Sequence, residues 1–282
     1  MRVEKTFMRF LPLISLTIAL AACSSSSPDK TAPPTAAASS AAPLASDPPT
    51  EAPEALPSAK PVSITDSTKL YEFNYTYPAE ASAIPALVGW FKLDAAKHKK
   101  ELIGEAKQGQ AEAKAAKQTY YPYGHSTKWQ VVTEIPGYLS LSAERWDSLG
   151  GAHPNPWQEG LVWNKRTGTR HRGTDFFLSQ KALSAAIRPQ FCAALDKQRA
   201  EKRGEPVKRK SGDPFDACID PAAQTVILGS SDKAHFTRIG ILIDPYEAGG
   251  YAEGNYEVTL PVTAAVLKAV KPQYRSVFAV PK

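Results

Sequence analysis

The sequence predicts an α+β protein with a mixed, largely antiparallel sheet and packed helices, preceded by a disordered tether. Short alternating segments follow one another like hairpins, rather than in regular strand–helix alternation. Prolines are concentrated near the N-terminus, where large apolar residues are almost absent. The chain has 282 residues, of which 43% are hydrophobic and 22% charged, so most of it can form a buried core. The net charge of +6 is mild and dispersed, and no nucleic-acid partner is expected.

Alternation of apolar and polar residues, or a short apolar run between turn residues, identifies the strands. The clearest strand is Leu70–Tyr77, in which Tyr71, Phe73, Tyr75 and Tyr77 fall on one face. The other predicted strands are Lys128–Thr133, Tyr138–Trp146, Gly160–Asn164, Gln224–Leu228, His235–Ile243 and Tyr256–Leu260.

Three segments have helical spacing. The first helix is predicted to begin at a Ser82 cap, with Pro85 in its first turn, and to end near Gln118. A second helix spans 175–203 and is predicted to be interrupted near Pro189, because proline removes a helical hydrogen bond. A short terminal helix spans 263–270.

The first 22 residues have the organisation of a bacterial export signal. Three basic residues precede the apolar run Phe10–Leu20, which is too short to span a bilayer as a helix. The run ends in Leu20-Ala21-Ala22-Cys23, which resembles the lipobox of bacterial lipoproteins. We therefore expect a signal peptide over 1–22 and lipidation of Cys23, with Ser24 favouring the outer membrane, facing the periplasm. An ordinary signal peptide with a chance cysteine is the alternative.

The following residues, 23–65, are predicted to form the tether. They are rich in Ala, Pro and Ser, and they cannot bury enough surface to offset the entropy of ordering. The predicted head covers 66–282, with an N-terminal part, 66–135, and a C-terminal part, 136–282. No Pro/Ser-rich linker divides the head, so we expect one cooperative unit.

Lipidation of Cys23 leaves Cys192 and Cys218 as a pair in an oxidising compartment. We expect a disulfide between them, and two buried free thiols are the alternative. The five histidines have no familiar metal spacing, and neither a nucleophile elbow nor a phosphate loop is visible. We therefore expect no cofactor, no metal and no catalytic residue. A hydrolase or deacetylase that uses His153, Asp175 or Glu247 is the alternative.

A basic segment, 197–210, lies between the two cysteines. It contains seven basic and two acidic residues. It is interpreted either as a solvated, flexible insertion or as a binding site for an anionic partner.

Two loops remain after the helices and strands are assigned. Gly150–Asn155 has the sequence GGAHPN, and its glycines permit positive φ or close backbone approach. The loop from Asp244 to Ala252 is rich in Pro, Gly and Tyr, and exposed tyrosines offer a large contact area at small entropic cost. Tight turns with buried rings are the alternative for both.

These loops, with the later TDFF segment, PYEAGGYAEGNYEVTLP and the terminal helix, resemble the RsiV-like C-terminal domain family. The preceding YEFNYTYPAEASAIPAL resembles the N-terminal region of PdaC-type peptidoglycan deacetylases. The resemblance covers roughly 66–276. In that family the best-understood member is a membrane-bound anti-sigma factor whose outer domain binds lysozyme.

The resemblance implies a lipid-anchored recognition module that binds a lysozyme-like protein or peptidoglycan without turnover. No sigma-binding segment or deacetylase domain is visible in the sequence, and a purely structural envelope role is a further alternative. Because animal lysozymes are strongly basic, Glu247 and Glu253 are expected to supply a neutral or acidic face. The expected binding residues are Gly150, Gly151, His153, Asn155, Pro245, Tyr246, Glu247, Tyr251 and Glu253.

Overall fold

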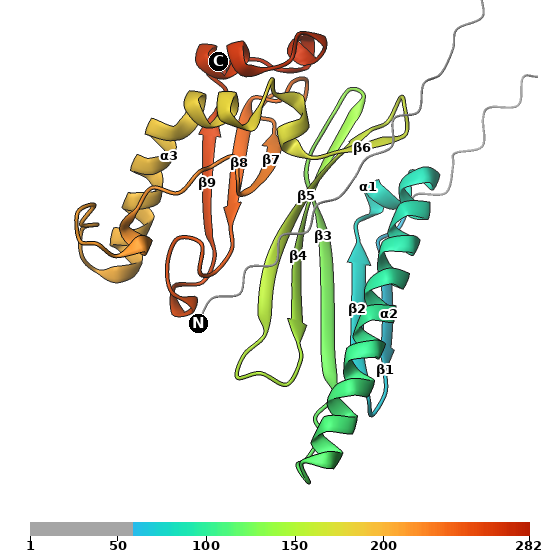
Figure 1. Cartoon of the computed structure of the whole chain (residues 1–282). Helices are drawn as coiled ribbons and strands as arrows, with labels where there is room; N and C mark the ends of the chain where they lie inside the picture. The colour runs from blue at the N-terminus through green and yellow to red at the C-terminus, as the bar shows by residue number, and fades with distance from the viewer. Residues whose placement is uncertain (1–58) are drawn as a thin grey trace, which may run out of the picture. The chain divides into compact units, whose positions relative to one another are not determined.

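The computed structural model describes residues 59–282, which belong to one compact unit. The predicted signal peptide, Cys23 and most of the predicted tether lie outside this range. The described chain contains a six-stranded and a three-stranded sheet with helices packed against them, which confirms the predicted α+β class (Figure 1). No helix in this part of the chain is long and apolar enough to cross a membrane.

The six-stranded sheet has its strands in sequence order. Four of the five neighbouring pairs are antiparallel, but β2 and β3 are parallel because the helix α2, Pro85–Ala115, carries the chain back between them. The strands are β1 (Val62–Ser67), β2 (Tyr71–Tyr77), β3 (Tyr123–Ile135), β4 (Tyr138–Ser148), β5 (Asn155–Asn164) and β6 (Thr169–His171).

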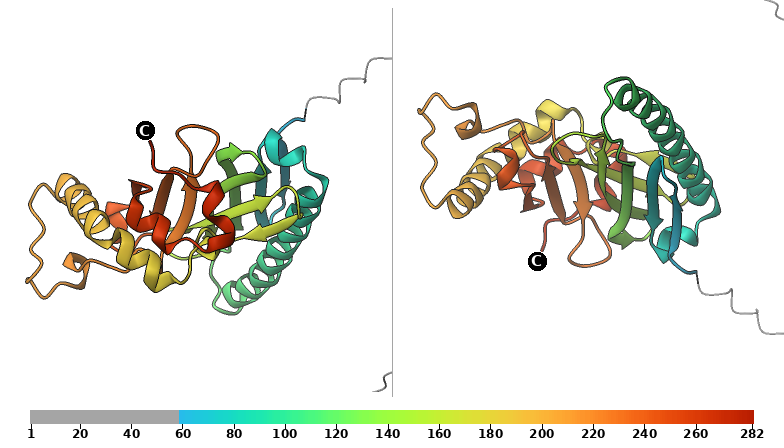
Figure 2. Two further views of the ribbon diagram at one scale, coloured as in Figure 1. Left: turned by 90° about the horizontal axis from the view of Figure 1, so that it is seen from above. Right: turned by 90° about the horizontal axis from the view of Figure 1, so that it is seen from below.

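One face of this sheet packs against α2, which lies beside β1 to β3 in Figures 1 and 2. The aromatic residues predicted on one face of β2 are all buried there, and Phe91 of α2 stacks on Tyr77 at 4.6 Å between ring centroids. A short helix, α1 (Ala79–Ser82), precedes α2. Burying this aromatic face stabilises the N-terminal half by the hydrophobic effect.

The three-stranded sheet packs against α3 and α4 and forms a second core. Its order is β7-β8-β9, entirely antiparallel. The elements are β7 (Thr225–Gly229), β8 (Arg238–Ile243), β9 (Tyr256–Pro261), α3 (Gln180–Arg203) and α4 (Ala264–Ala269). Single turns of 3₁₀ helix are found at Gly173–Phe176, Pro214–Asp216, Tyr251–Glu253 and Pro272–Val277.

The second core also takes in one end of the six-stranded sheet. Tyr138 of β4 and Val162 of β5 are buried with the residues of β7 to β9. Close approach is possible because Gly173 carries no side chain, and a Cβ there would overlap the carbonyl oxygen of Val226 in β7. The two sheets are therefore joined by a packed contact.

A buried ion-pair network fastens α2 to the sheet. Arg145 of β4 is fully buried, donates to Asp94 of α2 at 2.7 Å and pairs with Glu159 of β5 at 2.9 Å. The guanidinium of Arg145 and hydrogen bonds from His98 and Tyr75 hold the pKa of Asp94 well below its usual range, although burial opposes them. Because each buried charge has a partner, removing one would leave the other unpaired at high cost.

Several element boundaries differ from the prediction. Strand β1 begins at Val62, within the range predicted as tether, and β6 was not predicted at all, because both are short and weakly apolar. Ser82 ends α1 instead of capping α2, and its hydroxyl donates to the carbonyl of Lys60.

The predicted break near Pro189 was wrong. Helix α3 is continuous from Gln180 to Arg203, after a separate 3₁₀ turn. Pro189 is exposed, whereas Ile187 and Phe191 on either side are buried, so packing of the apolar face holds the helix together despite the missing N–H.

The contact between the two sheets can be tested with Gly173→Ala. The added methyl group would overlap the Val226 carbonyl, and we expect the free energy of unfolding to fall by about 1–3 kcal/mol in urea denaturation. Gly250→Ala is the matched control, since its φ is −64° and nothing lies within 4 Å of the new Cβ. Equal stability of the two variants would contradict the role given to Gly173.

Candidate functional site

The two loops that stood out in the sequence lie against each other. Gly150–Asn155 connects β4 to β5, and the Tyr-rich loop, residues 244–255, connects β8 to β9. The ring of Tyr251 stacks on the ring of His153 with centroids 3.7 Å apart and planes at 20°. The hydroxyl of Tyr251 also donates to the carbonyl of Pro154 at 3.0 Å. Residues nearly a hundred positions apart therefore build one surface.

Tyr246 completes an aromatic cluster, which we define as His153, Tyr246 and Tyr251. Its ring centroid lies 5.8 Å from that of Tyr251 and 6.5 Å from that of His153. The Tyr246 side chain is 57% exposed, and its backbone has a φ of +71°, which is unusual for a residue with a side chain. A strained residue that projects an aromatic ring into solvent is a recognised feature of functional loops.

Side chains of helix α3 hold the Tyr-rich loop by donating hydrogen bonds to the backbone carbonyls of the loop. Arg199, fully buried, donates from Nε to the carbonyl of Ala248 at 2.8 Å. Lys202 donates from Nζ to the carbonyls of Glu253 and Asn255, both at 2.6 Å. These contacts are charge-assisted and fix the loop at its middle and at its C-terminal end, so it presents its rings with little freedom left to lose on binding.

A second set of contacts uses the Glu253 side chain. Arg203 donates from Nε to Oε2 of Glu253 at 2.9 Å, and Tyr256 donates its hydroxyl to the same carboxylate. These hydrogen bonds hold the pKa of Glu253 below its usual range, although burial acts in the opposite direction. Glu253 therefore stabilises the loop internally and does not supply the acidic face that the sequence suggested.

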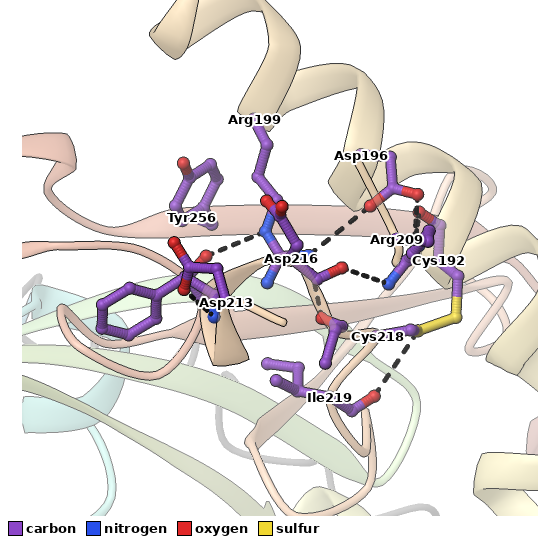
Figure 3. A network of polar contacts seen from close by, with 12 residues as sticks. Cys192, Asp196, Arg199, Arg209, Asp213, Asp216, Cys218, Ile219 and Tyr256 are labelled. Atoms are coloured by element: carbon purple, nitrogen blue, oxygen red, sulfur yellow. Dashed lines mark hydrogen bonds and ion pairs between the residues drawn. A yellow bond between two sulfur atoms is a disulfide. The ribbon is translucent and has the colours of Figure 1, made fainter. Parts of the chain in front are cut away.

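The segment after α3, residues 204–217, is fastened to the helix (Figure 3). Cys192 and Cys218 form the predicted disulfide, with Cα atoms 5.5 Å apart. Arg209 pairs with Asp196 at 2.5 Å, and Arg203 pairs with Asp216 at 2.8 Å. The chain between the cysteines thus returns to α3 at several points.

The basic segment combines arginines that are tied to the fold with exposed lysines. Arg199, Arg203 and Arg209 each donate to carboxylates or carbonyls of the same chain. Lys197 and Lys208 are exposed and pair only with glutamates on the surface. A guanidinium carries five N–H donors in one fixed geometry, and a count of charges in the sequence does not reveal which acceptors of the same chain they reach. Binding of an anionic partner by this segment stays a prediction.

The remaining predicted binding residues belong to the same two loops. Gly150 has a φ of +80°, as its position in a tight turn requires, and Asn155 is the first residue of β5. Pro245 is half-buried, and Glu247 is exposed. Sequence reasoning found both loops and singled out the basic segment, but it did not predict that Arg199, Lys202 and Arg203 hold the Tyr-rich loop, because that contact joins residues about fifty positions apart.

The three residues proposed for catalysis do not converge. His153 belongs to the aromatic cluster, and the nearest polar contact of Glu247 is Gln224 at 3.4 Å. Asp175 lines a different place, a groove of about 580 Å³ between β5, β6 and β7, where it pairs with Arg172 at 3.1 Å. Within residues 59–282, no group of His, Cys, Asp and Glu side chains is arranged to hold a metal ion.

Asp244, at the start of the Tyr-rich loop, is a half-buried carboxyl group. Burial raises its pKa to about 6, and the charge of Glu247 acts in the same direction. One of its oxygens, Oδ1, is buried without a hydrogen-bond partner among the described residues. The ionised form of Asp244 is thus disfavoured in the fold.

Comparison with known proteins gives one family match. The family model described as deacetylase PdaC matches residues 64–156, which include the Gly150–Asn155 loop but not the Tyr-rich loop. This match confirms the PdaC-type part of the resemblance and extends beyond the predicted 66–135. The RsiV-like part stays a prediction. A search of the curated proteins found no match.

Two solved structures are similar to this chain. One is a DUF3298 family member from Bacteroides fragilis that is 15% identical, with a TM-score of 0.48. The match covers 72% of this chain and 90% of that chain. The other is a DUF3298 family protein from Pseudomonas aeruginosa, 12% identical, with a TM-score of 0.43, covering 78% of this chain and 96% of its own. Neither likeness is close enough to transfer a function or a site.

We expect loss of the disulfide to lower the stability of the protein and to loosen the Tyr-rich loop. For a separation of 26 residues, the chain-entropy account predicts that Cys192→Ala/Cys218→Ala lowers the free energy of unfolding by roughly 3–4 kcal/mol. Hydrogen exchange of residues 244–255 should also become faster, because Arg203 and Arg209 lose a fixed partner segment. The exchange of β2 amides is the internal control. Unchanged exchange in the loop would contradict this coupling.

Asp244 predicts a pH dependence of stability. A pKa raised in the fold means that the native state binds more protons than the unfolded state between about pH 4 and pH 6, so stability falls as pH rises through this range. Asp244→Asn should remove this slope and raise the free energy of unfolding at pH 7 by roughly 1–2 kcal/mol. Chemical denaturation at several pH values measures both. An unchanged slope in the variant would show that Asp244 is not its cause.

Proposed function

We propose that this protein is a cell-envelope recognition module whose aromatic cluster binds a lysozyme-like muramidase without turning over a substrate. The observation that carries the proposal is the convergence of the two loops into one aromatic surface, in which Tyr246 is exposed and His153 and Tyr251 are half-buried, with the Tyr-rich loop held by α3. Tyrosines on a rigid loop are typical of protein-recognition sites, because they bury a large area at a small entropic cost.

The local charge is compatible with a basic partner. The arginines of the basic segment are held inside the fold by carboxylates and carbonyls, and they do not face the aromatic cluster as unpaired charges. Glu247, next to Tyr246, is exposed. The long-range repulsion expected from the positive net charge is therefore reduced where contact would be made.

The cellular setting is part of the proposal. The match of residues 64–156 to the PdaC model supports an association with the cell envelope. The lipobox-like Leu20–Cys23 supports lipidation of Cys23, and the tether would hold the head away from the outer membrane on its periplasmic side.

A binding function is favoured over peptidoglycan hydrolysis or deacetylation by the positions of the polar groups. Asp175 lies apart from His153 and Glu247 and is already paired with Arg172, and no hydrogen bond joins His153 to Glu247 among the described residues. A general acid or base must lie within hydrogen-bond reach of the group it serves. These residues do not meet that requirement as a set.

The test is calorimetric titration of the full-length protein in detergent with a c-type lysozyme, with lytic activity measured in parallel. We expect submicromolar binding and reduced lysis. Tyr246→Ala and Tyr251→Ala should each weaken binding by about tenfold or more, since central tyrosines contribute most to such interfaces.

Tyr121→Ala is the matched control, because Tyr121 is 74% exposed and lies outside both loops. No binding by the wild-type protein at moderate salt would overturn the muramidase proposal. A cell-wall glycan would then be the alternative ligand of the aromatic cluster, detected by co-sedimentation with insoluble peptidoglycan that is lost in the same two variants.

A further inference from the structure

The charges of α2 lie on two separate sides of the helix. At about 100° per residue, four of its lysines fall within about 80° of the helix circumference and extend along roughly 33 Å of its length. We call this set the lysine stripe: Lys92, Lys100, Lys107 and Lys114. The acidic residues of the helix fall within about 40° on another side, centred roughly 155° from the stripe. They are Asp94, Glu101, Glu105 and Glu112.

The acidic side of α2 is used within the fold. Asp94 accepts a hydrogen bond from Arg145 at 2.7 Å. Glu101 lies 3.5 Å from His98. Negative charge of the helix is therefore directed towards groups of the same chain.

The lysine stripe, in contrast, has no carboxylate partner among residues 59–282. All four residues are exposed, and the ion pairs formed by lysines of α2 involve only Lys97 and Lys99. In the basic segment, by comparison, Lys197 and Lys208 pair with glutamates. The stripe is therefore a positive surface that the described part of the fold does not neutralise.

The kind of basic residue indicates the kind of partner. Apart from His98, every basic residue of α2 is a lysine. Arginine is preferred where a fixed, planar fork recognises one carboxylate or phosphate group, whereas lysine is a flexible and strongly hydrated point charge. A row of lysines therefore suits attraction to a surface that carries many anionic groups in no fixed register.

An exposed apolar side chain accompanies the stripe. Leu93 is 73% exposed and lies about two turns before Lys100, on the same side of the helix. At a bilayer surface, apolar side chains enter the headgroup region while lysines keep their ammonium groups in water. A leucine among lysines therefore fits a phospholipid surface better than it fits a soluble acidic polymer.

The helix is followed by a lysine with an unusual backbone. Lys117 has a φ of +55°, and the N–H of Gln118 donates to the carbonyl of Ala113 at 2.8 Å, which closes the C-terminal turn. Glycine is the usual residue at such a position, because it adopts positive φ without strain. A lysine there adds a further positive charge beyond Lys114 at a cost in backbone strain.

The chain enters the head beside the start of α2. The hydroxyl of Ser82, the last residue of α1, donates to the carbonyl of Lys60 at 2.6 Å. The residues that lead back to Cys23 therefore join the head near the N-terminal end of the helix. With the lipid anchor proposed above, the stripe would remain close to a bilayer, which raises the effective concentration of that surface.

We propose that the lysine stripe docks the head on the surface of an anionic phospholipid bilayer. The negative headgroups supply the charge that the fold does not provide to these lysines, and Leu93 enters the interface. The attraction is screened by salt, so docking is reversible and the head exchanges between this position and the reach of the tether. The inference goes beyond the proposed function and does not depend on binding of a muramidase, because the aromatic cluster belongs to other elements.

The test is chemical footprinting of the full-length protein reconstituted on vesicles. One set of vesicles contains phosphatidylcholine alone, and the other contains equal parts of phosphatidylcholine and phosphatidylglycerol. Lysine acetylation by an N-hydroxysuccinimide ester, followed by mass spectrometry, measures the exposure of each side chain. We expect slower acetylation of the stripe on the anionic vesicles than on the neutral ones, with the difference lost at high salt. Lys181 and Lys268, exposed residues outside α2, are the internal controls.

Removing three lysines of the stripe should abolish this protection. Each lysine near an anionic surface contributes about fivefold to partitioning, so Lys100→Gln/Lys107→Gln/Lys114→Gln should reduce docking about a hundredfold. Lys92, which the variant retains, reports the loss through faster acetylation. Thermal unfolding shows whether the variant is folded.

The matched control is Lys181→Gln/Lys268→Gln/Lys282→Gln. All three residues are exposed and lie outside α2, and the variant changes the net charge by the same amount. It should leave Lys92 protected on anionic vesicles. Loss of that protection in both triple variants would overturn the proposal, because net charge and not the stripe would then be responsible.

Lys117→Gly separates the effect of charge from that of stability. It removes one lysine and also relieves the positive φ at this position. We expect thermal stability equal to or above that of the wild type, together with docking weakened about fivefold.

Equal acetylation of the stripe on both kinds of vesicle would overturn the proposal. Protection of Lys197, Lys208 and Lys210 without protection of the stripe would also overturn it, and would assign bilayer contact to the basic segment. Protection of the stripe by soluble polyglutamate but not by anionic vesicles would assign it to an acidic protein. The triple stripe variant should bind lysozyme like the wild type, so failure of this proposal is distinguishable from failure of the proposed function.

Discussion

The six-stranded sheet packs one face against α2 and part of the other face against the three-stranded sheet. The rest of the structure depends on this arrangement. One face is filled by α2 and the aromatic residues of β2. The other face is shared, because only the end formed by residues such as Tyr138 and Val162 joins the core of the three-stranded sheet. That division requires glycine at 160 and 173, where backbones approach closely, and it leaves the opposite end of the face open to solvent.

The buried arginine side chains of this protein hold its elements together. Arg145 ties α2 to the six-stranded sheet, and Arg199 and Arg203 tie the Tyr-rich loop to α3. Each of these guanidinium groups serves more than one acceptor, which is why arginine and not lysine suits the position. Part of the excess of basic residues between the two cysteines therefore serves to hold a loop.

The aromatic cluster draws on two parts of the chain. His153 comes from the range that matches the PdaC model, and Tyr246 and Tyr251 come from beyond it. Aromatic rings held on rigid loops suit the recognition of a protein surface.

The sequence by itself determined the elements whose signal is local. Alternation specified β2, helical spacing specified α2, and the count of cysteines specified the Cys192–Cys218 pair. The sequence did not predict the short edge strands β1 and β6 or the continuity of α3, because pairing and packing override weak local preferences. Only the tertiary structure decided that His153 stacks on Tyr251 and that α3 holds the Tyr-rich loop, since such contacts depend on how distant segments pack.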